Sequence, residues 1–573
     1  MNKIERITLK KKEIIVKEIF WSSEIDNINE TISLTEYIDV NSSALRKKLI
    51  KVINDIENQN TTCIENFKIE NEFNFWILTN FSEKSLYKKN KFYELTKIIA
   101  IIEICNQQDF DEIKITINDK IYSDILLKIF SKKKVNIYTS HTKPFLNLFH
   151  NFIIEINSFL KACKFLLLKF FLNKRKSKVD NDNNLFISFF AYINKKKFHE
   201  NKYSSLFWRE IQNHTKINFL HLFIPNEISN NFNQINMKIK KLEKNNETHG
   251  FLDAHINFGI IIKIFLKSLQ IKYNFHLNKN KMKLNFNDYE IIEAILFDLN
   301  QNFHFFNVVI KLYYFYLFKV FFKRNKFNSN CFYIYENQPW EKSLIYHWKK
   351  NNPHKIYGVV NTAVRFWDLR FAKSKLTPDI LLANGEDSFN KVVDLGHLSS
   401  EVRVVESLRY KKINHIINHK KNNSILIIFD YSKKSNSYLL KLLNKTIKIL
   451  DYDIIFKEHP LNKLTNIKTN FKYKRFEDFM VRDNYDLVIC TNTTNASIDY
   501  VLAGHNVAVL KGPDDFNFSP LKDNSACKFF KDNKELTDIL LNLNYTYREE
   551  QKNTFFKIDQ EYKEWIKIFN EKD

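Results

Sequence analysis

Residues 453–513 constrain the fold of this chain more than any other stretch of the sequence. Two apolar runs, 454–456 and 486–490, each break into a polar turn, and after the second turn apolar residues recur at helical spacing as far as Gly504. Residues 506–510 are β-branched and apolar again. The order strand, turn, helix, strand is typical of a parallel sheet covered by helices, so an α/β fold is predicted here.

Two polar loops follow the strands of this stretch. One contains His459, and the other is the turn 491–495, whose sequence is TNTTN. Both loops are expected at the carboxyl edge of the sheet, where ligands bind in open parallel sheets. Hydroxyl groups and backbone N–H groups at the beginning of a helix favour an anion, so the sequence predicts a phosphate site. The alternative is an ordinary helix cap at Thr493 or Thr494 and a histidine without a ligand.

The 573 residues are enough for several domains. Residues 1–145 are typical of a small α/β domain, and 146–184 of an apolar, basic helix followed by a polar linker. Residues 185–409 are predicted to form a Rossmann-like domain with a helical insertion at about 226–330. Residues 424–573 are predicted to form a second Rossmann-like domain with C-terminal helices. The expected class is therefore α/β, with two doubly wound domains and an additional N-terminal α/β region.

The net charge of +24 predicts attraction to anionic surfaces, although the Asn-, Lys- and Ile-rich composition, which suggests an AT-rich genome, accounts for part of it. No basic segment carries a nucleic-acid-binding motif, so nucleic acid is not an expected partner. The apolar stretches 146–175 and 303–323 contain lysines and lack a charge-free run of about 18 residues. They indicate either interfacial helices on a membrane or buried helices with extended lysines.

Six scattered cysteines without a CxxC motif predict buried thiols in a reducing compartment and no metal cluster. The first twenty residues alternate charged and apolar residues, unlike a signal peptide. We therefore expect a cytoplasmic protein, with the inner face of the plasma membrane as one candidate surface of contact.

Four motifs lie in the second half of the chain: ENQPWE at 336–341, NTAVRFWDLR at 361–370, PDILLANG at 378–385 and VESLRY at 405–410. With them the sequence resembles a family of bacterial surface-carbohydrate biosynthesis proteins, which implies a role in O-antigen or capsule-type polysaccharide assembly. The two wound sheets are similar in layout to GT-B glycosyltransferases. The His-Pro pair and the Thr-Thr turn resemble motifs that hold the nucleotide phosphate in bacterial sialyltransferases. The acidic motif of those enzymes is not reproduced at 384–387, which reads NGED.

This resemblance implies a glycosyltransferase that needs neither cofactor nor metal ion. The expected partners are a nucleotide-sugar donor, with CMP-linked sugars among the candidates, and a lipid-linked or growing glycan acceptor. His459 would donate a proton to the leaving phosphate. The general base would be Asp368, whose pKa Phe366 and Trp367 would raise by desolvation, with Glu336 and Glu386 as further candidates.

The alternative for Asp368 is a structural pair with Arg365 or Arg370, and the alternative for Trp367 as a sugar-stacking ring is core packing. The predicted substrate-binding residues are Lys457, Glu458, Thr491, Thr493, Thr494, Asn495, Ser432, Lys434, Asn337, Arg365, Trp367 and Asn384.

Three other functions stay open: a non-catalytic assembly protein with this fold, a small-molecule epimerase of the same layout, and a nucleic-acid-binding protein suggested by charge alone. The oligomeric state is not predicted.

Overall fold

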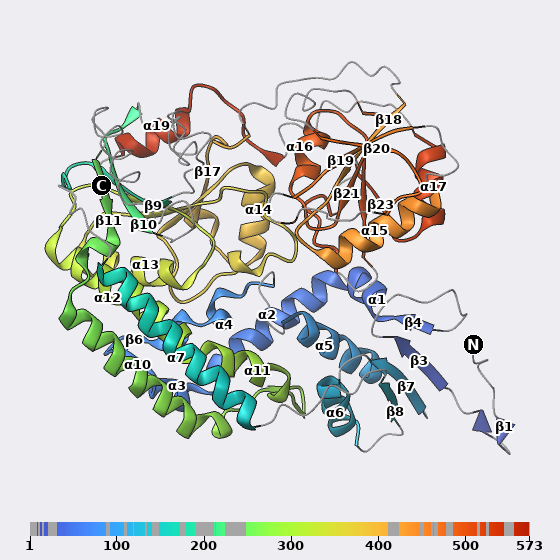
Figure 1. The fold of residues 1–573 in the computed structure, drawn as a ribbon, viewed down its shortest axis with the longest axis horizontal. Coiled ribbons are helices and arrows are strands. Elements are labelled where there is room, and N and C mark those ends of the chain that lie inside the picture. Colours follow the sequence, from blue (N-terminus) through green and yellow to red (C-terminus); the bar gives the residue numbers. More distant parts are fainter. Residues whose placement is uncertain are drawn as a thin grey trace.

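The computed structural model describes residues 8–9, 12–13, 16–20, 31–86, 92–107, 112–117, 120–131, 135–139, 148–171, 179–190, 211, 214–223, 248–410, 423–446, 452–459, 462, 468–476, 485–512, 516–522, 527–543 and 555–571. Within these ranges the chain forms two large α/β lobes above an N-terminal and helical region (Figure 1). Most of the predicted insertion before residue 248, part of the linker 146–184, and Pro460 lie outside the described residues.

The first lobe is built on seven parallel strands in the order β11-β10-β9-β14-β15-β16-β17. Their bounds are β9 Asn184–Phe190, β10 Ile217–Phe223, β11 Thr248–Phe251, β14 Cys331–Ile334, β15 Ile356–Val359, β16 Ile380–Ala383 and β17 Val402–Val404. The strands are runs of apolar residues because both faces of the sheet are buried in hydrophobic clusters. Helices α13 (Pro339–Asn351) and α14 (Glu386–Asp394) connect successive strands.

The second lobe contains six parallel strands in the order β20-β19-β18-β21-β22-β23. Their bounds are β18 Ser424–Ile428, β19 Asp453–Lys457, β20 Tyr473–Arg475, β21 Leu487–Thr491, β22 Val507–Leu510 and β23 Cys527–Phe530. The helices are α15 Lys433–Thr446, α16 Ala496–Leu502 and α17 Asn533–Leu541. The strand, turn, helix, strand order predicted for 453–513 is confirmed, as is the fold class of two Rossmann-like lobes with an additional N-terminal α/β region.

The N-terminal region has a third, four-stranded parallel sheet in the order β4-β3-β7-β8. Its strands are β3 Val16–Phe20, β4 Thr31–Ser33, β7 Glu112–Ile117 and β8 Val135–Thr139, and its main helices are α1 Leu34–Val40, α2 Ser42–Asn58, α5 Phe92–Gln107 and α6 Lys120–Ile129. The shorter elements are β1 Thr8–Leu9, β2 Lys12–Glu13, α3 Thr61–Glu65, β5 Lys68–Glu70, β6 Phe73–Asn74, η1 Phe75–Leu78 and α4 Asn80–Glu83.

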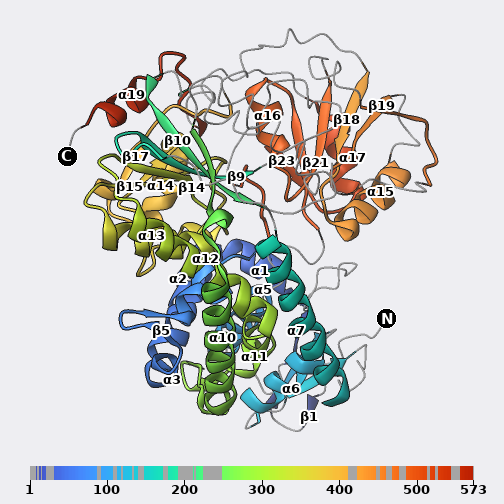
Figure 2. The same cartoon turned by 60° about the vertical axis from the view of Figure 1, so that its left-hand side comes forward.

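A helical layer lies beside this region, with α7 Leu148–Phe171, α10 Phe258–Asn278, α11 Glu293–Asn302 and α12 Phe305–Arg324 (Figure 2). Short elements flank it: η4 Leu252–His255, η5 Lys279–Lys281, β12 Asn285–Phe286 and β13 Tyr289–Glu290. Helix α12 is long and apolar enough to cross a membrane, but 67% of its most apolar window is buried inside the fold. It is therefore a core helix, and the interfacial interpretation of 303–323 does not hold. One hydrophobic core joins this layer, the N-terminal helices and one face of the first sheet.

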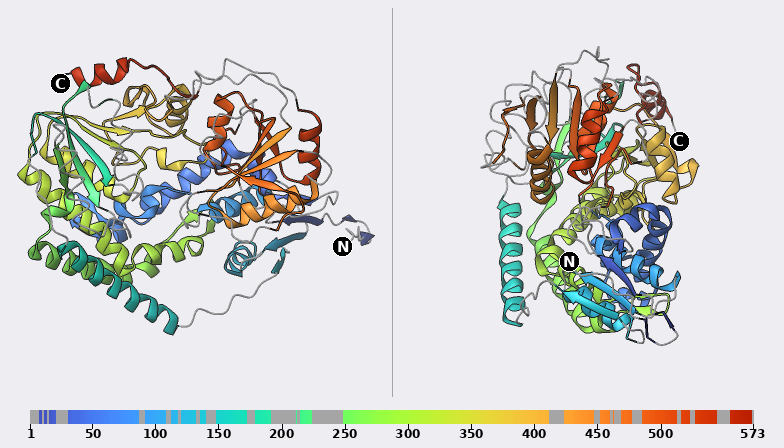
Figure 3. Two further views of the ribbon diagram at one scale, coloured as in Figure 1. Left: turned by 45° about the horizontal axis from the view of Figure 1, so that its top comes forward. Right: turned by 90° about the vertical axis from the view of Figure 1, so that its right-hand side faces the viewer.

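The end of the chain returns to the first lobe. Helix α19 (Lys563–Asn570) packs against the seven-stranded sheet, where the ring of Trp565 lies 6.5 Å from that of Phe332. Figure 3 shows this helix on the side of the first lobe, far from α17. The range 424–573, predicted as one domain, therefore contributes its last helix to the other domain. The physical reason is a buried aromatic cluster on that face of the sheet, which α19 completes.

Candidate functional site

The carboxyl edges of the two large sheets face each other, and Arg365 connects them. Arg365 follows β15 of the first lobe, and its Nη2 atom donates to the backbone oxygen of Thr493 at 2.7 Å and to Oδ1 of Asn495 at 2.6 Å. Both acceptors belong to the turn between β21 and α16 of the second lobe. The predicted turn therefore lies at the junction between the lobes, in direct contact with a residue assigned to the same site from the sequence.

Three loops of the second lobe meet at this junction. The turn after β18 places Asp430 within hydrogen-bond distance of Thr493, whose hydroxyl donates to the buried carboxylate. The backbone N–H of Ser432 donates to the other oxygen of Asp430 at 2.6 Å. The loop after β19 brings the ring of His459 to 6.3 Å from that of Tyr431. His459 and Thr493 therefore lie at one edge of the sheet, as the strand order requires.

Buried polar atoms without a hydrogen-bond partner occur at these same strand ends. Such atoms are uncommon in folded proteins, and a water, an ion or a ligand is one way in which their bonding is completed. In the described part of the chain they include Oγ1 of Thr491, Oδ1 of Asn492, Oδ1 of Asn361 and Nδ2 of Asn384. The first two lie on the second lobe and the last two on the first. Polar groups from both lobes are thus available to a ligand at the junction.

Asp499 is a titratable group at the junction that the sequence did not point to. It lies on α16, four residues after Asn495, and its Oδ1 atom is buried without a hydrogen-bond partner. Burial raises the pKa of Asp499 to about 6, against the opposing attraction of Arg409 and Lys457. A carboxyl group with a pKa near neutrality beside two cations is typical of a functional site, although structural charge networks produce the same shift.

Asp368, the first candidate for the general base, is held in a bidentate ion pair. Nε and Nη2 of Arg370 donate to its two carboxylate oxygens, both at 2.7 Å, and Asp368 is 2% exposed. This is the structural pair considered as the alternative. Each carboxylate oxygen accepts one bond from Arg370, so the pair fixes the loop after β15, and a catalytic role of Asp368 stays a prediction. Glu336 is half-exposed, accepts a hydrogen bond from Gln338, and lies 4.0 Å from the same arginine.

Two of the predicted substrate-binding side chains are fully enclosed. The ring of Trp367 is buried and lies 5.0 Å from that of Phe516, so no face of it is open to a sugar. Asn337 is also buried, and its side-chain amide donates to the backbone oxygens of Ser82 and Glu83 at 3.1 Å. The expectation that these two side chains contact substrate does not hold, because each joins the first lobe to another part of the chain.

The remaining predicted residues lie at or beside the junction. Lys457, the last residue of β19, approaches the hydroxyl of Tyr500 at 3.4 Å and lies over the ring of Phe476. Glu458 is within 3.7 Å of Arg475. Thr494 accepts from the backbone N–H of Ala496, and Ser432 accepts from that of Ser435. Lys434 is exposed in the first turn of α15.

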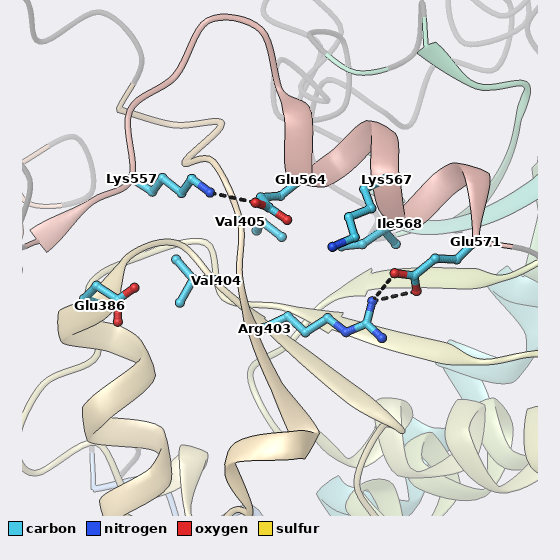
Figure 4. A pocket seen from close by; sticks show the side chains of 9 residues that line it. All are labelled: Glu386, Arg403, Val404, Val405, Lys557, Glu564, Lys567, Ile568 and Glu571. Carbon is cyan, nitrogen blue, oxygen red and sulfur yellow. Dashed lines mark hydrogen bonds and ion pairs between the residues drawn. The ribbon is translucent and has the colours of Figure 1, made fainter.

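Glu386 lies in a pocket whose lining residues come from the first lobe and from the C-terminal segment that packs on it. The pocket has a volume of about 550 Å³ and is lined by Glu386, Arg403, Val404, Val405, Lys557, Glu564, Lys567, Ile568 and Glu571 (Figure 4). Two ion pairs already form across it, Arg403 with Glu571 and Lys557 with Glu564. Glu386 is exposed at the beginning of α14, one strand away from the loop that carries Arg365.

The segment 555–557 closes one side of this pocket, and we call it the strap. The backbone N–H of Lys557 donates to the oxygen of Asn384 at 2.9 Å, and that of Ser407 donates to the oxygen of Lys557 at 2.8 Å. The buried carboxylate of Glu406 accepts from the backbone N–H groups of Glu564 and Trp565 at the beginning of α19. The strap and α19 are therefore fixed to the carboxyl edge of the first sheet.

The described residues contain no group of three or more His, Cys, Asp or Glu side chains that could hold a metal ion. Five of the six cysteines are buried and the sixth, Cys163, is half-buried, and all six are free thiols. Asp430 was also missed as a site residue, although its position directly after β18 was a readable signal. No signal in the sequence pointed to Asp499, because an acidic residue within a helix is most often exposed to solvent.

No protein-family model matches the sequence, and no curated protein matches it. Solved structures are similar to it in fold. HepE from Anabaena, solved in complex with UDP and glucose, matches 65% of this chain and 92% of its own at 10% identity and a TM-score of 0.31. MnaA from S. aureus, solved with UDP, matches 68% and 99% at 9% identity and a TM-score of 0.36. MurG from Acinetobacter baumannii matches 68% and 99% at 11% identity and a TM-score of 0.35. At these scores the likeness adds no argument about the site or the activity.

Proposed function

We propose that the protein is a glycosyltransferase that uses a nucleotide-activated sugar, and that the donor binds at the junction between the two lobes. The observation that carries the proposal is the contact of Arg365 with the turn after β21. It brings the carboxyl edges of two parallel sheets together, and buried polar atoms without partners lie on both. Ligands of open α/β sheets bind at such edges.

The residues at the junction fit the charge of a nucleotide-sugar. The bond from the anomeric carbon to a phosphate oxygen breaks during transfer, and negative charge develops on that oxygen. The guanidinium of Arg365, the ammonium of Lys457 and the imidazole of His459 are cations or proton donors at this edge. Preorganised charge of this kind stabilises the leaving group in the transition state without a metal ion.

The pocket with Glu386 is proposed as the acceptor site. Its three carboxylates and three basic side chains offer many hydrogen bonds to sugar hydroxyls. Glu386 would accept the proton of the acceptor hydroxyl as that oxygen bonds to the anomeric carbon. The motif resemblance favours a lipid-linked or growing glycan of a surface polysaccharide as the acceptor, and the net charge of +24 favours one held at an anionic surface.

The first test is nucleotide-dependent stabilisation of the purified protein. UDP, GDP and CMP are added separately, and the thermal midpoint is measured. A nucleotide at about one hundred times its Kd stabilises the folded state by about 2.7 kcal/mol, so one of the three should raise the midpoint clearly. Arg365→Ala and His459→Ala should reduce this shift, because each removes a positive or proton-donating group from the phosphate site.

Thr537→Val is the matched control, because Thr537 lies on α17 and its hydroxyl donates to the backbone oxygen of Asn533 in the same helix. It should respond to nucleotide as the unmodified protein does. If no nucleotide stabilises the unmodified protein, or if the two site variants respond as fully as Thr537→Val, the donor site is not at this junction.

A non-catalytic assembly protein is the second candidate, and the ion pair of Asp368 with Arg370 favours it, because the first candidate base is occupied. The replacement Glu386→Gln separates the two functions. A transferase should lose product formation and keep nucleotide binding, whereas an assembly protein should support polysaccharide synthesis as before. An epimerase of the same layout would convert a free nucleotide-sugar with no acceptor present.

A further inference from the structure

Exposed apolar side chains are concentrated on two helices of this protein. Of the eighteen large apolar side chains that are exposed in the described part of the chain, twelve lie on α7 and α10. On α10 they are Phe258, Ile262, Leu266, Leu269, Tyr273 and Leu277. Their spacing of three or four residues places them on one stripe along the helix. Isolated exposed apolar residues are ordinary, but a contiguous stripe of them marks an interaction surface.

Helix α10 is apolar on both sides, which a helix at the surface of a globular protein does not require. Its inner side, with Ile260, Ile264, Ile271 and Phe275, is buried in the main core. The outer stripe is therefore additional to what the fold needs. The helix has 21 residues and is about 30 Å long at 1.5 Å per residue, so the stripe runs the length of a small domain.

Helix α7 carries a second stripe of the same kind. Its exposed residues are Ile153, Ile156, Phe159, Leu160, Leu167 and Leu168, while Ala162 and Leu166 on the other side are buried. The helix is fixed to the fold by a buried ion pair, in which Lys169 contacts Asp253 at 2.5 Å. We call the two outer stripes together the α7/α10 face.

The two stripes form one surface. Helices α7 and α10 each pack against α12. The rings of Phe159 on α7 and Phe265 on α10 are 5.8 Å apart, and Glu155 forms an ion pair with Lys272 across the two helices. The α7/α10 face is therefore a broad apolar surface on a rigid support.

Lysines accompany the stripes, and in the described part of the chain they have no acidic partner. Lys161 and Lys164 are exposed on α7, and Lys263 and Lys267 lie along α10. No ion pair among the described residues involves these four lysines, whereas the acidic Glu155 is already shared by Lys272 and His304. Burial and the neighbouring Lys263 lower the pKa of Lys267, and its ammonium donates to the side-chain oxygen of Gln270, a neutral acceptor.

We propose that the α7/α10 face docks the protein on the surface of an anionic phospholipid bilayer. The apolar stripes would enter the boundary between headgroups and acyl chains, and the four lysines would contact anionic headgroups. The charge favours a bilayer over a second copy of the chain, because pairing this face with itself would bring the four lysines of one copy against those of another. The proposal does not depend on the glycosyltransferase function.

The test is sedimentation of the full chain with lipid vesicles. Vesicles of phosphatidylcholine alone are compared with vesicles that also contain phosphatidylglycerol, at low and high salt. The protein should bind the anionic vesicles and bind less at high salt. The double replacement Leu266→Asp/Leu269→Asp should weaken binding about tenfold or more, because it places charge on the apolar stripe. Lys263→Glu/Lys267→Glu should weaken it as strongly by repelling the headgroups.

Leu398→Asp and Leu541→Asp are matched controls, because both leucines are exposed elsewhere on the molecule, at 60% and 66%. They should bind as the unmodified protein does, and circular dichroism and the thermal midpoint verify that every variant is folded. The proposal fails if the unmodified protein does not sediment with anionic vesicles, or if the face variants bind as well as the controls. It also fails if the unmodified protein is a dimer that does not bind vesicles and that Leu266→Asp/Leu269→Asp converts to a monomer. In that case the face is an interface between two copies of the chain.

Discussion

At the scale of single residues, the junction between the lobes brings a guanidinium and a buried carboxyl group to one turn and the helix that follows it. Arg365 donates to oxygen atoms of Thr493 and Asn495, and Asp499 has one oxygen without a hydrogen-bond partner. A buried carboxyl group prefers to be protonated, because burial penalises its charged form. Asp499 should therefore make the stability of the protein depend on pH in a direction opposite to that of a carboxylate stabilised by an ion pair.

The pKa of Asp499 is about 6 in the folded chain, against an ordinary value of 3.8. Folding thus takes up a proton between these two values, and stability should fall as pH rises through this interval. Asp499→Asn removes the effect and should be more stable than the unmodified protein above pH 6. The expected gain is about 1–3 kcal/mol, because each unit by which folding raises the pKa costs about 1.4 kcal/mol. Urea denaturation between pH 4 and 8 measures the difference, which should vanish at the acidic end.

Asp538→Asn is the control for this prediction, because Asp538 is exposed on α17 in the same lobe. It should leave the pH profile unchanged. If the stability of Asp499→Asn runs parallel to that of the unmodified protein between pH 4 and 8, folding does not raise the pKa of Asp499.

At the scale of elements, the strap depends on a glycine at the end of β16. A Cβ atom on Gly385 would lie 2.3 Å from the backbone oxygen of Phe555 and 2.7 Å from Cα of Phe556. Both are backbone atoms, which cannot turn aside as a flexible side chain can. The close approach of two backbones is what allows the strap to hydrogen-bond to the carboxyl edge of the sheet.

Gly385→Ala should displace the strap and destabilise the protein by about 1–3 kcal/mol, because overpacking forces the backbone to shift. Hydrogen exchange of the backbone amides of Ser407 and Lys557 should become faster, since both donate bonds in this contact. Gly259→Ala is the control: a Cβ there meets only the side-chain oxygen of Asn257 at 3.4 Å, at the beginning of α10. Equal effects of the two replacements would argue against a contact specific to the strap.

Most elements of the two lobes were predictable from the sequence, because apolar runs of three to five residues alternate with polar turns between residues 331 and 512. The N-terminal region contains an element that the sequence does not reveal. Apolar residues continue from Phe73 to Leu78, but strand β6 ends at Asn74, whose side chain accepts from the backbone N–H of Ile77 where η1 begins. Such side-chain capping competes with strand pairing and leaves no periodic signal.

The candidate site was predictable only in part. The turn at 491–495 and the loop of His459 could be located because strand ends fix their position. The partner of each side chain could not, because Arg365 and Thr493 are 128 residues apart, and only the folded chain brings them together. The burial of Trp367 depends likewise on Phe516 of the other lobe.

At the scale of the whole molecule, the N-terminal helices join both lobes. Arg46 on α2 donates to the backbone oxygen of Phe366 at 2.9 Å, and its guanidinium lies 4.0 Å from the ring of the same residue. Lys522 of the second lobe lies 3.6 Å from that ring and donates to the hydroxyl of Ser42. One phenyl ring of the first lobe thus contacts cations from the other two parts of the chain.

Arg46→Ala should weaken the attachment of the N-terminal region and destabilise the protein by about 1–3 kcal/mol, since it removes a hydrogen bond and a cation–π contact. Thermal unfolding should show an earlier or a second transition, because the N-terminal helices would separate from the lobes first. Lys47→Ala is the control, because Lys47 is exposed on the same helix. A single transition at an unchanged temperature for Arg46→Ala would contradict this role.

The chain passes between the two lobes twice, once after β17 and once through the strap, and the two passages are bonded to each other. Ser407 and Lys557 share a backbone hydrogen bond, and the rings of Tyr410 and Phe556 stack at 3.8 Å. A paired crossing of this kind is a double-stranded link, in which each passage supports the other. Together with the bonds of Arg365 to the turn after β21, it attaches the lobes at two separate points.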